Sequence, residues 1–187
     1  GISLTGSGGL TLTGANTFDG ETQVSGGVLT IVSDSALGAT TGGVAVQSGG
    51  TVELRNGASI GGETIQLNGS GASGQSGALV STIGTNTFAG SVVAATDASI
   101  AALPGSTLNL VGGLVKNGTV ATLTGGGAIT ISGAGISGAS PNSDLVVDGT
   151  GTVVTLNTTN SYNGPTFVQN SGTLVLGLSN ALPTTPR

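Results

Sequence analysis

The chain has 187 residues, enough for one domain of ordinary size whose core needs no disulfide bonds. It contains 37 Gly, only 6% charged and 2% aromatic residues, and no His, Cys, Met or Trp. A hydrophobic content of 36% argues against disorder, and glycine without a strict period of three excludes collagen. With so few large side chains, the core must be narrow and filled by small aliphatic and β-branched residues.

The formal net charge is −5, because eight acidic residues face only Arg55, Lys116 and Arg187. An acidic chain without a basic patch repels phosphate backbones, which excludes nucleic-acid binding. The absence of His and Cys excludes His-dependent catalytic triads and soft-metal sites. No apolar run approaches the roughly 18 residues of a membrane-spanning helix, so no transmembrane segment is expected. Low charge and the lack of Cys and Met favour an extracellular setting.

The first organised stretch, residues 8–37, predicts a strand, a corner, a second strand, a corner and a third strand. A degenerate copy returns at residues 156–182, and a shorter match occupies residues 83–90. The residues that recur are an Asn, an aromatic residue and a Gly, spaced two apart: Asn16, Phe18 and Gly20, then Asn86, Phe88 and Gly90, then Asn160, Tyr162 and Gly164. The longer copies also align Val168 with Val24 and Leu174 with Leu29. Internal repetition of this kind indicates a repeat architecture.

Apolar clusters recur along the chain at intervals of 21 or 22 residues, as from Val24 to Val46, from Val46 to Leu67 and from Ile31 to Val52. This interval predicts an all-β, three-sided solenoid with about 21 residues per coil and parallel strands about 4.8 Å apart. We expect residues 1–187 to be a single solenoid segment excised from a longer chain, with enlarged corners near 69–77 and 138–143. An up-and-down barrel or a β-sandwich is the rival fold, because it also combines short strands with Gly-rich turns.

The sequence LTGANTFDG (12–20), followed by VSGGVL (24–29), resembles the autotransporter-associated β-strand repeat. This repeat occurs in passenger regions of type V secreted proteins and in other large bacterial surface proteins. The resemblance implies a right-handed parallel β-helix displayed outside the cell, and it implies no activity. The last copy departs from the pattern, since Thr158 replaces the first Gly and Pro165 follows Gly164.

The recurring residues are expected to be structural. An Asn side chain at a corner can satisfy backbone groups of its own or an adjacent coil. Phe18, Phe88 and Tyr162 are expected to pack inside, and the three Gly residues to form corners. Asp19 and Glu21 are interpreted as solvated charges, because the last copy has Asn163 and Pro165 in their places. We therefore predict no catalytic, cofactor-binding or metal site, and no enzyme activity.

The sequence favours a structural rod of a bacterial surface-exposed or secreted protein that presents or supports adhesion to an unidentified host-cell or matrix receptor. A first alternative is a subunit of an extracellular fibre, self-associating through unpaired strand edges at the solenoid ends. A second is a glycan- or ice-binding module. It ranks last because Thr11, Thr13, Thr22 and Thr30 do not form one convincing ladder.

Overall fold

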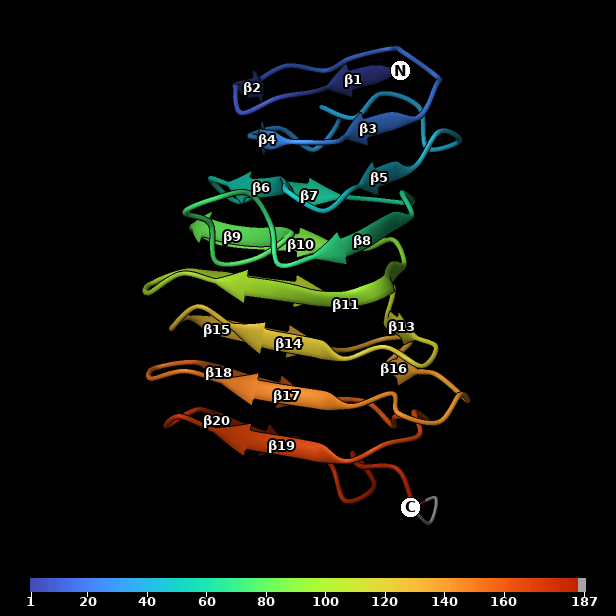
Figure 1. The fold of residues 1–187 in the computed structure, drawn as a ribbon, viewed down its shortest axis with the longest axis vertical. Helices are drawn as coiled ribbons and strands as arrows, with labels where there is room; N and C mark the ends of the chain where they lie inside the picture. Colours follow the sequence, from blue (N-terminus) through green and yellow to red (C-terminus); the bar gives the residue numbers. More distant parts are fainter. Residues whose placement is uncertain (185–187) are drawn as a thin grey trace.

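A computed structural model describes residues 1–184 of the chain, so the last three residues of the expected segment, 185–187, lie outside the described residues. Short parallel strands follow one another around a common axis and stack in about eight coils, with the two ends of the chain at opposite ends of the rod (Figure 1). In Figure 1 the strands nearest the viewer run leftward while the chain descends, which gives the coil a right-handed sense. The predicted parallel β-solenoid is confirmed.

Three faces form the solenoid, and neighbouring strands of one face come from successive coils. The first face contains β1 (Ile2–Leu4), β3 (Thr22–Val24), β5 (Val44–Val46), β8 (Ile65–Gly69), β13 (Leu114–Lys116) and β16 (Ile136–Ser137). The second face contains β2 (Gly9–Leu12), β4 (Gly27–Ile31), β6 (Gly50–Arg55), β9 (Leu79–Ile83), β14 (Ala121–Thr124), β17 (Leu145–Asp148) and β19 (Thr166–Gln169). The long strand β11 (Val92–Ala102) belongs to both and joins them into one 14-stranded sheet. The third face is a separate six-stranded sheet of β7 (Ser59–Ile60), β10 (Thr85–Phe88), β12 (Thr107–Leu110), β15 (Ala128–Ile131), β18 (Val153–Leu156) and β20 (Thr173–Leu176).

The core is a set of apolar columns, one inward-facing residue per coil. On the first face, Val24 pairs with Val46 and Val46 with Leu67, as the sequence intervals predict. On the second face the column runs through Leu29, Val52, Leu79, Ile100, Leu123 and Val147, all of which are fully buried. Because most inward positions have a parallel neighbour above and below, medium-sized aliphatic side chains fill most of the narrow interior, and Phe88 and Tyr162 are the fully buried aromatic residues among those that the structure describes.

One of the sequence intervals is wrong in register, and the two long copies of the repeat lie on different faces. Ile31 pairs with Leu54 and not with Val52, because this coil takes 23 residues to return to the second face. Val168 continues the column of Leu29 through Val147, and so lies on the second face, whereas Val24 lies on the first. The strands of the last copy, β19 and β20, therefore lie on the second and third faces, whereas the corresponding strands of the first copy, β3 and β4, lie on the first and second faces. A strand–corner–strand unit fits any pair of adjacent faces, so its local sequence does not determine which pair it occupies.

The structure places irregular segments where enlarged corners are expected. Residues 70–78 separate β8 from β9, and residues 138–144 separate β16 from β17. The first of these is held to the solenoid by Thr51, whose Oγ1 donates to the carbonyl of Gly77 at 2.9 Å and accepts from the amide of Ala72 at 2.9 Å.

Each end of the rod has strands that pair on one side only within residues 1–184: β1 and β2 at one end, and β19 and β20 at the other. The second of these ends exposes the large apolar side chains of Phe167, Val168, Val175 and Leu176. Within the described residues, no helix is long and apolar enough to cross a membrane.

Candidate functional site

The recurring Asn residues bind the backbone at the corners. Asn86 is fully buried, and its Oδ1 accepts from the amides of Gly57 and Ala58, at 2.9 Å each, in the preceding coil. Its Nδ2 lies within hydrogen-bonding distance of Ser81 Oγ (2.8 Å) and of the carbonyl of Ile83 (3.0 Å). One side chain thus satisfies backbone groups from two coils that would otherwise be buried without partners.

The other two Asn residues make related bonds. Asn16 is half-buried and donates through Nδ2 to the carbonyl of Ala36 at 2.7 Å. Asn160 is buried, donates to the carbonyl of Ala181 at 2.6 Å, and accepts through Oδ1 from the amide of Ile136 at 2.6 Å. In each of these two copies, the Asn amide donates to the carbonyl of an Ala about one coil later.

The aromatic residues of the three copies differ in burial. Phe88 and Tyr162 are fully buried, whereas Phe18 is half-buried near one end of the rod. Of the three glycines, Gly90 is buried, and a Cβ built on it would overlap the backbone of Glu63 in the neighbouring coil. Gly20 and Gly164 are half-buried, and Gly164 has a φ of 119°, a conformation that favours glycine. These residues build corners and core, and no two of the three copies come together in one site.

A fully buried lysine is the feature that sequence reasoning missed. Lys116 is the last residue of β13 and points into the core, where its Nζ donates to the carbonyl of Ser143 at 2.6 Å and lies 4.2 Å from the centre of the Tyr162 ring. Burial lowers the pKa of Lys116 to about 8, and the nearby Asp144 carboxylate opposes this shift. Burial likewise raises the pKa of Tyr162, whose hydroxyl bonds to Thr166. The alternation of Leu114, Val115 and Lys116 was the available signal, because it places Lys116 on the inward side.

Glycine makes room for this cluster. Gly138 occupies the coil between Lys116 and Tyr162, since the amide of Asn163 donates to the carbonyl of Gly138 and β13 pairs with β16. Its lack of a side chain lets the lysine stem and the tyrosine ring meet across that coil. Ser143, in the irregular segment 138–144, also accepts through Oγ from the amide of Gly118 at 2.8 Å. The buried lysine therefore ties this segment to the core.

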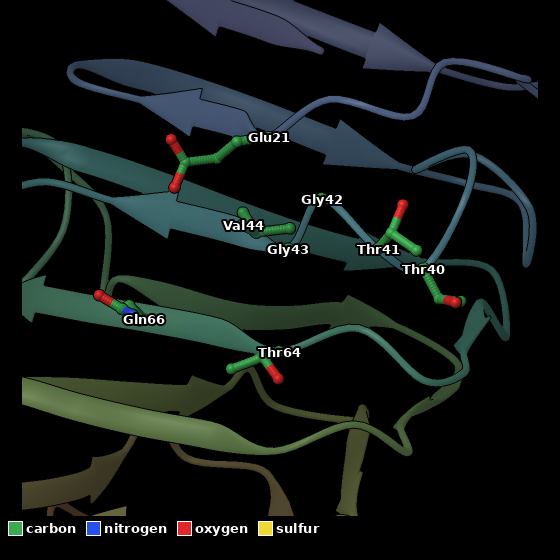
Figure 2. Close-up of a pocket in the computed structure, with 8 residues that line it drawn as sticks. All are labelled: Glu21, Thr40, Thr41, Gly42, Gly43, Val44, Thr64 and Gln66. Atoms are coloured by element: carbon green, nitrogen blue, oxygen red, sulfur yellow. The ribbon is translucent and has the colours of Figure 1, made fainter.

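A polar cleft of about 190 Å³ lies on the first face across three coils (Figure 2). Glu21 and Gln66 lie toward one end of it and Thr40 and Thr41 toward the other, with Thr64 along its lower side. These side chains offer one carboxylate, one amide and three hydroxyl groups, a set that can hydrogen-bond a small polar molecule. Sequence reasoning did not find the cleft, because its lining comes from three coils.

The charged residues do not form a cation site in the described chain. Within residues 1–184, no three or more His, Cys, Asp or Glu side chains come together as a set that could hold a metal ion. Arg55 Nε lies 3.2 Å from Glu53 Oε1 in a partly exposed ion pair, which contributes little to stability. Glu63 is buried away from this pair. Burial raises its pKa, and a hydrogen bond from the backbone of Gly43 acts in the opposite direction.

The stacked parallel strands and the recurring Asn bonds at the corners define a parallel β-solenoid built from a repeat. Residues 4–31 and 145–176 match the family described as passenger-associated-transport-repeat. The chain is also similar to the "Adhesin BmaC autotransporter" of Brucella suis biovar 1 (strain 1330), with 39% identity over 69 residues. That match covers 37% of this chain and 2% of the relative. No solved structure matches the chain. The chain thus carries two segments similar to autotransporter-associated repeats, one near each end of the described rod.

Proposed function

We propose that the chain is a structural rod within a bacterial surface-exposed or secreted autotransporter-like protein, and that it supports adhesion. The observation that carries the proposal is the parallel pairing of strands from successive coils along the described rod, combined with passenger repeats near both ends. The adhesin relative supports the adhesive role.

A rod whose function lies in its shape tolerates a change of length if the register of the coils is kept. Deleting residues 107–127 removes one coil and joins Ser106 to Ala128. Because Thr107 is the register partner of Ala128, β15 can then pair with β10. Deleting residues 107–117 removes half a coil, including β13, and places the residues that lead into the second-face strand β14 on the third face.

The test uses the full-length protein on intact bacterial cells, with an epitope inserted in the exposed segment at residues 73–76. We expect the whole-coil deletion to keep surface staining and cell adhesion close to those of the parent, and the half-coil deletion to abolish both. Equal loss in the two deletions would contradict the rod. If the whole-coil deletion keeps its surface staining but loses cell adhesion, the result contradicts the adhesive role and leaves the structural rod supported.

A second candidate function is assembly into an extracellular fibre. It is favoured by the one-sided pairing of β19 and β20 and by the exposed apolar residues on these strands, such as Phe167 and Leu176. A following coil of the same chain would cover the same edge equally well. Sedimentation of the full-length secreted protein over a range of concentrations separates the two functions, since mass that grows with concentration supports the fibre and constant mass contradicts it.

A further inference from the structure

The outer surface of the third face carries a polar ladder. Parallel register aligns one hydroxyl- or amide-bearing residue per coil over five successive strands: Ser59, Thr87, Asn109, Thr130 and Thr155. Neighbouring parallel strands are about 4.8 Å apart, so the polar groups recur at that interval along the rod axis. We name these five residues the hydroxyl column. Sequence reasoning missed this column because Thr11, Thr22 and Thr30 lie on the first and second faces. There, Thr11 aligns with Thr30, and Glu53 follows in the next coil.

The hydrogen-bonding capacity of the hydroxyl column is largely unused. Among the described residues, its one side-chain bond is a long contact from Asn109 Nδ2 to Thr87 Oγ1, at 3.5 Å. Threonines elsewhere behave differently, as Thr30 donates to Glu53 at 2.8 Å and Thr119 to the carbonyl of Ala94 at 3.0 Å. The side chains of the column are half-exposed, apart from the exposed Ser59, so their polar groups can bond to a ligand.

The residues beside the column are uncharged and partly apolar. No Asp, Glu, Lys or Arg occurs in the outward or inward positions of β10, β12, β15, β18 and β20. Val111, which is 38% exposed, and the half-buried Val153 add apolar surface on either side. A charged group lies at the N-terminal end of the column, where Asp34 accepts from the amide of Ser59 at 2.8 Å. The face is therefore regular and neutral, with polar and apolar groups side by side.

We propose that the third face binds an extended, neutral polysaccharide whose chain lies along the rod axis. Such a chain presents hydroxyl groups at each sugar, which the column can bind, and C–H surfaces that can pack against Val111 and Val153. The strands hold the column in place before binding, so little conformational entropy is lost. Charge selects a neutral ligand, because the face itself has no cation and the chain carries a net charge of −5, which repels an acidic glycan. This inference rests on the proposed extracellular rod and gives it a ligand class.

The experiment measures binding of cellohexaose, an extended β-linked hexasaccharide, to the full-length protein by isothermal titration calorimetry. The test variant T87V/T130V/T155V removes three hydroxyls from the column, and valine keeps the strands because it is β-branched. The matched control, T11V/T13V/T122V, removes three hydroxyls from other parts of the rod. We expect the test variant to bind about tenfold more weakly or worse, the control to bind like the parent, and cellobiose to bind at least about tenfold more weakly than cellohexaose.

Affinity should also be insensitive to salt, because no ion pair contributes. Equal affinity in the two triple variants, equal binding of cellobiose and cellohexaose, or no binding of cellohexaose would overturn the proposal. If the protein inhibits ice growth and binds no oligosaccharide, the ligand of the column is ice. That result would also overturn the polysaccharide proposal. Surface staining of the triple variant is scored separately, so that failure of export is distinguished from failure of binding.

Discussion

The ammonium of Lys116 lies 4.2 Å from the centre of the Tyr162 ring, although the two residues are two coils apart and an apolar core surrounds them. A cation over an aromatic face is stabilised more strongly when both groups are removed from water. Even so, the lysine keeps a cost of burial, as its lowered pKa shows. The cluster therefore makes the stability of the solenoid depend on pH.

The sign of this dependence follows from the pKa of Lys116, which is about 8 in the folded chain and 10.5 when unperturbed. Between these values the unfolded state binds the proton and the folded state releases it, so raising the pH stabilises the fold. We expect the free energy of unfolding to rise between pH 8 and pH 10 by at most about 1.4 kcal/mol per pH unit. Above this range the raised pKa of Tyr162 acts in the opposite direction, because the unfolded tyrosine ionises first.

Urea denaturation at several pH values measures this slope. The variant Lys116→Met keeps an apolar side chain of similar length without the titrating group, so its stability should be flat from pH 8 to pH 10. A slope that persists in Lys116→Met would show that another group is responsible.

Asn86 should be the most sensitive of the recurring polar residues. Replacing it with Ala leaves the buried amides of Gly57 and Ala58 without their acceptor, which costs about 2 kcal/mol or more. Hydrogen exchange is the direct measurement, since the amide protons of these two residues should exchange faster. Asn109→Ala, on the same sheet but half-exposed, serves as the control and should change stability by about 0.5 kcal/mol or less. Similar losses in both variants would refute a special role for Asn86.

Gly90 should not tolerate even a methyl group. A Cβ at this position would overlap the backbone of Glu63, so Gly90→Ala must push two coils apart and should destabilise the chain by about 1–3 kcal/mol or more. Gly61 provides the matched control, because no atom lies within 4 Å of a Cβ built there and its φ is not positive. Thermal melts of Gly90→Ala and Gly61→Ala compare the two, and an unchanged melting temperature for Gly90→Ala would count against the close packing of coils at this corner.

Phe88 fills the core at the third face, and truncation to Ala should cost about 3–5 kcal/mol. Phe167 is 46% exposed on β19, so Phe167→Ala should cost far less. Denaturation midpoints of the two variants test the difference. A cost for Phe167→Ala as large as that for Phe88→Ala would mean that another part of the protein covers β19.

Much of the fold could be predicted from residue spacing. The columns of Val24, Val46 and Leu67 follow from an interval of 21 or 22 residues, because a parallel solenoid requires one inward apolar residue per face and coil. Register on the second face could not be predicted to the residue. Coils differ in length at their corners, and Ile31 therefore pairs with Leu54.

The sequence by itself determined the kind of structure: apolar residues of moderate size at coil intervals, Asn and Gly at corners, and too few large side chains for a wide core. Only the tertiary structure decided which face each copy occupies, since the local unit fits any two adjacent faces. It also decided what the coils bring together. Lys116 meets Tyr162, and Thr87 aligns with Thr130, through stacking that depends on the summed length of all corners between them. The stretch 8–37 specifies how a coil is built, and the register between coils creates the surfaces that can bind.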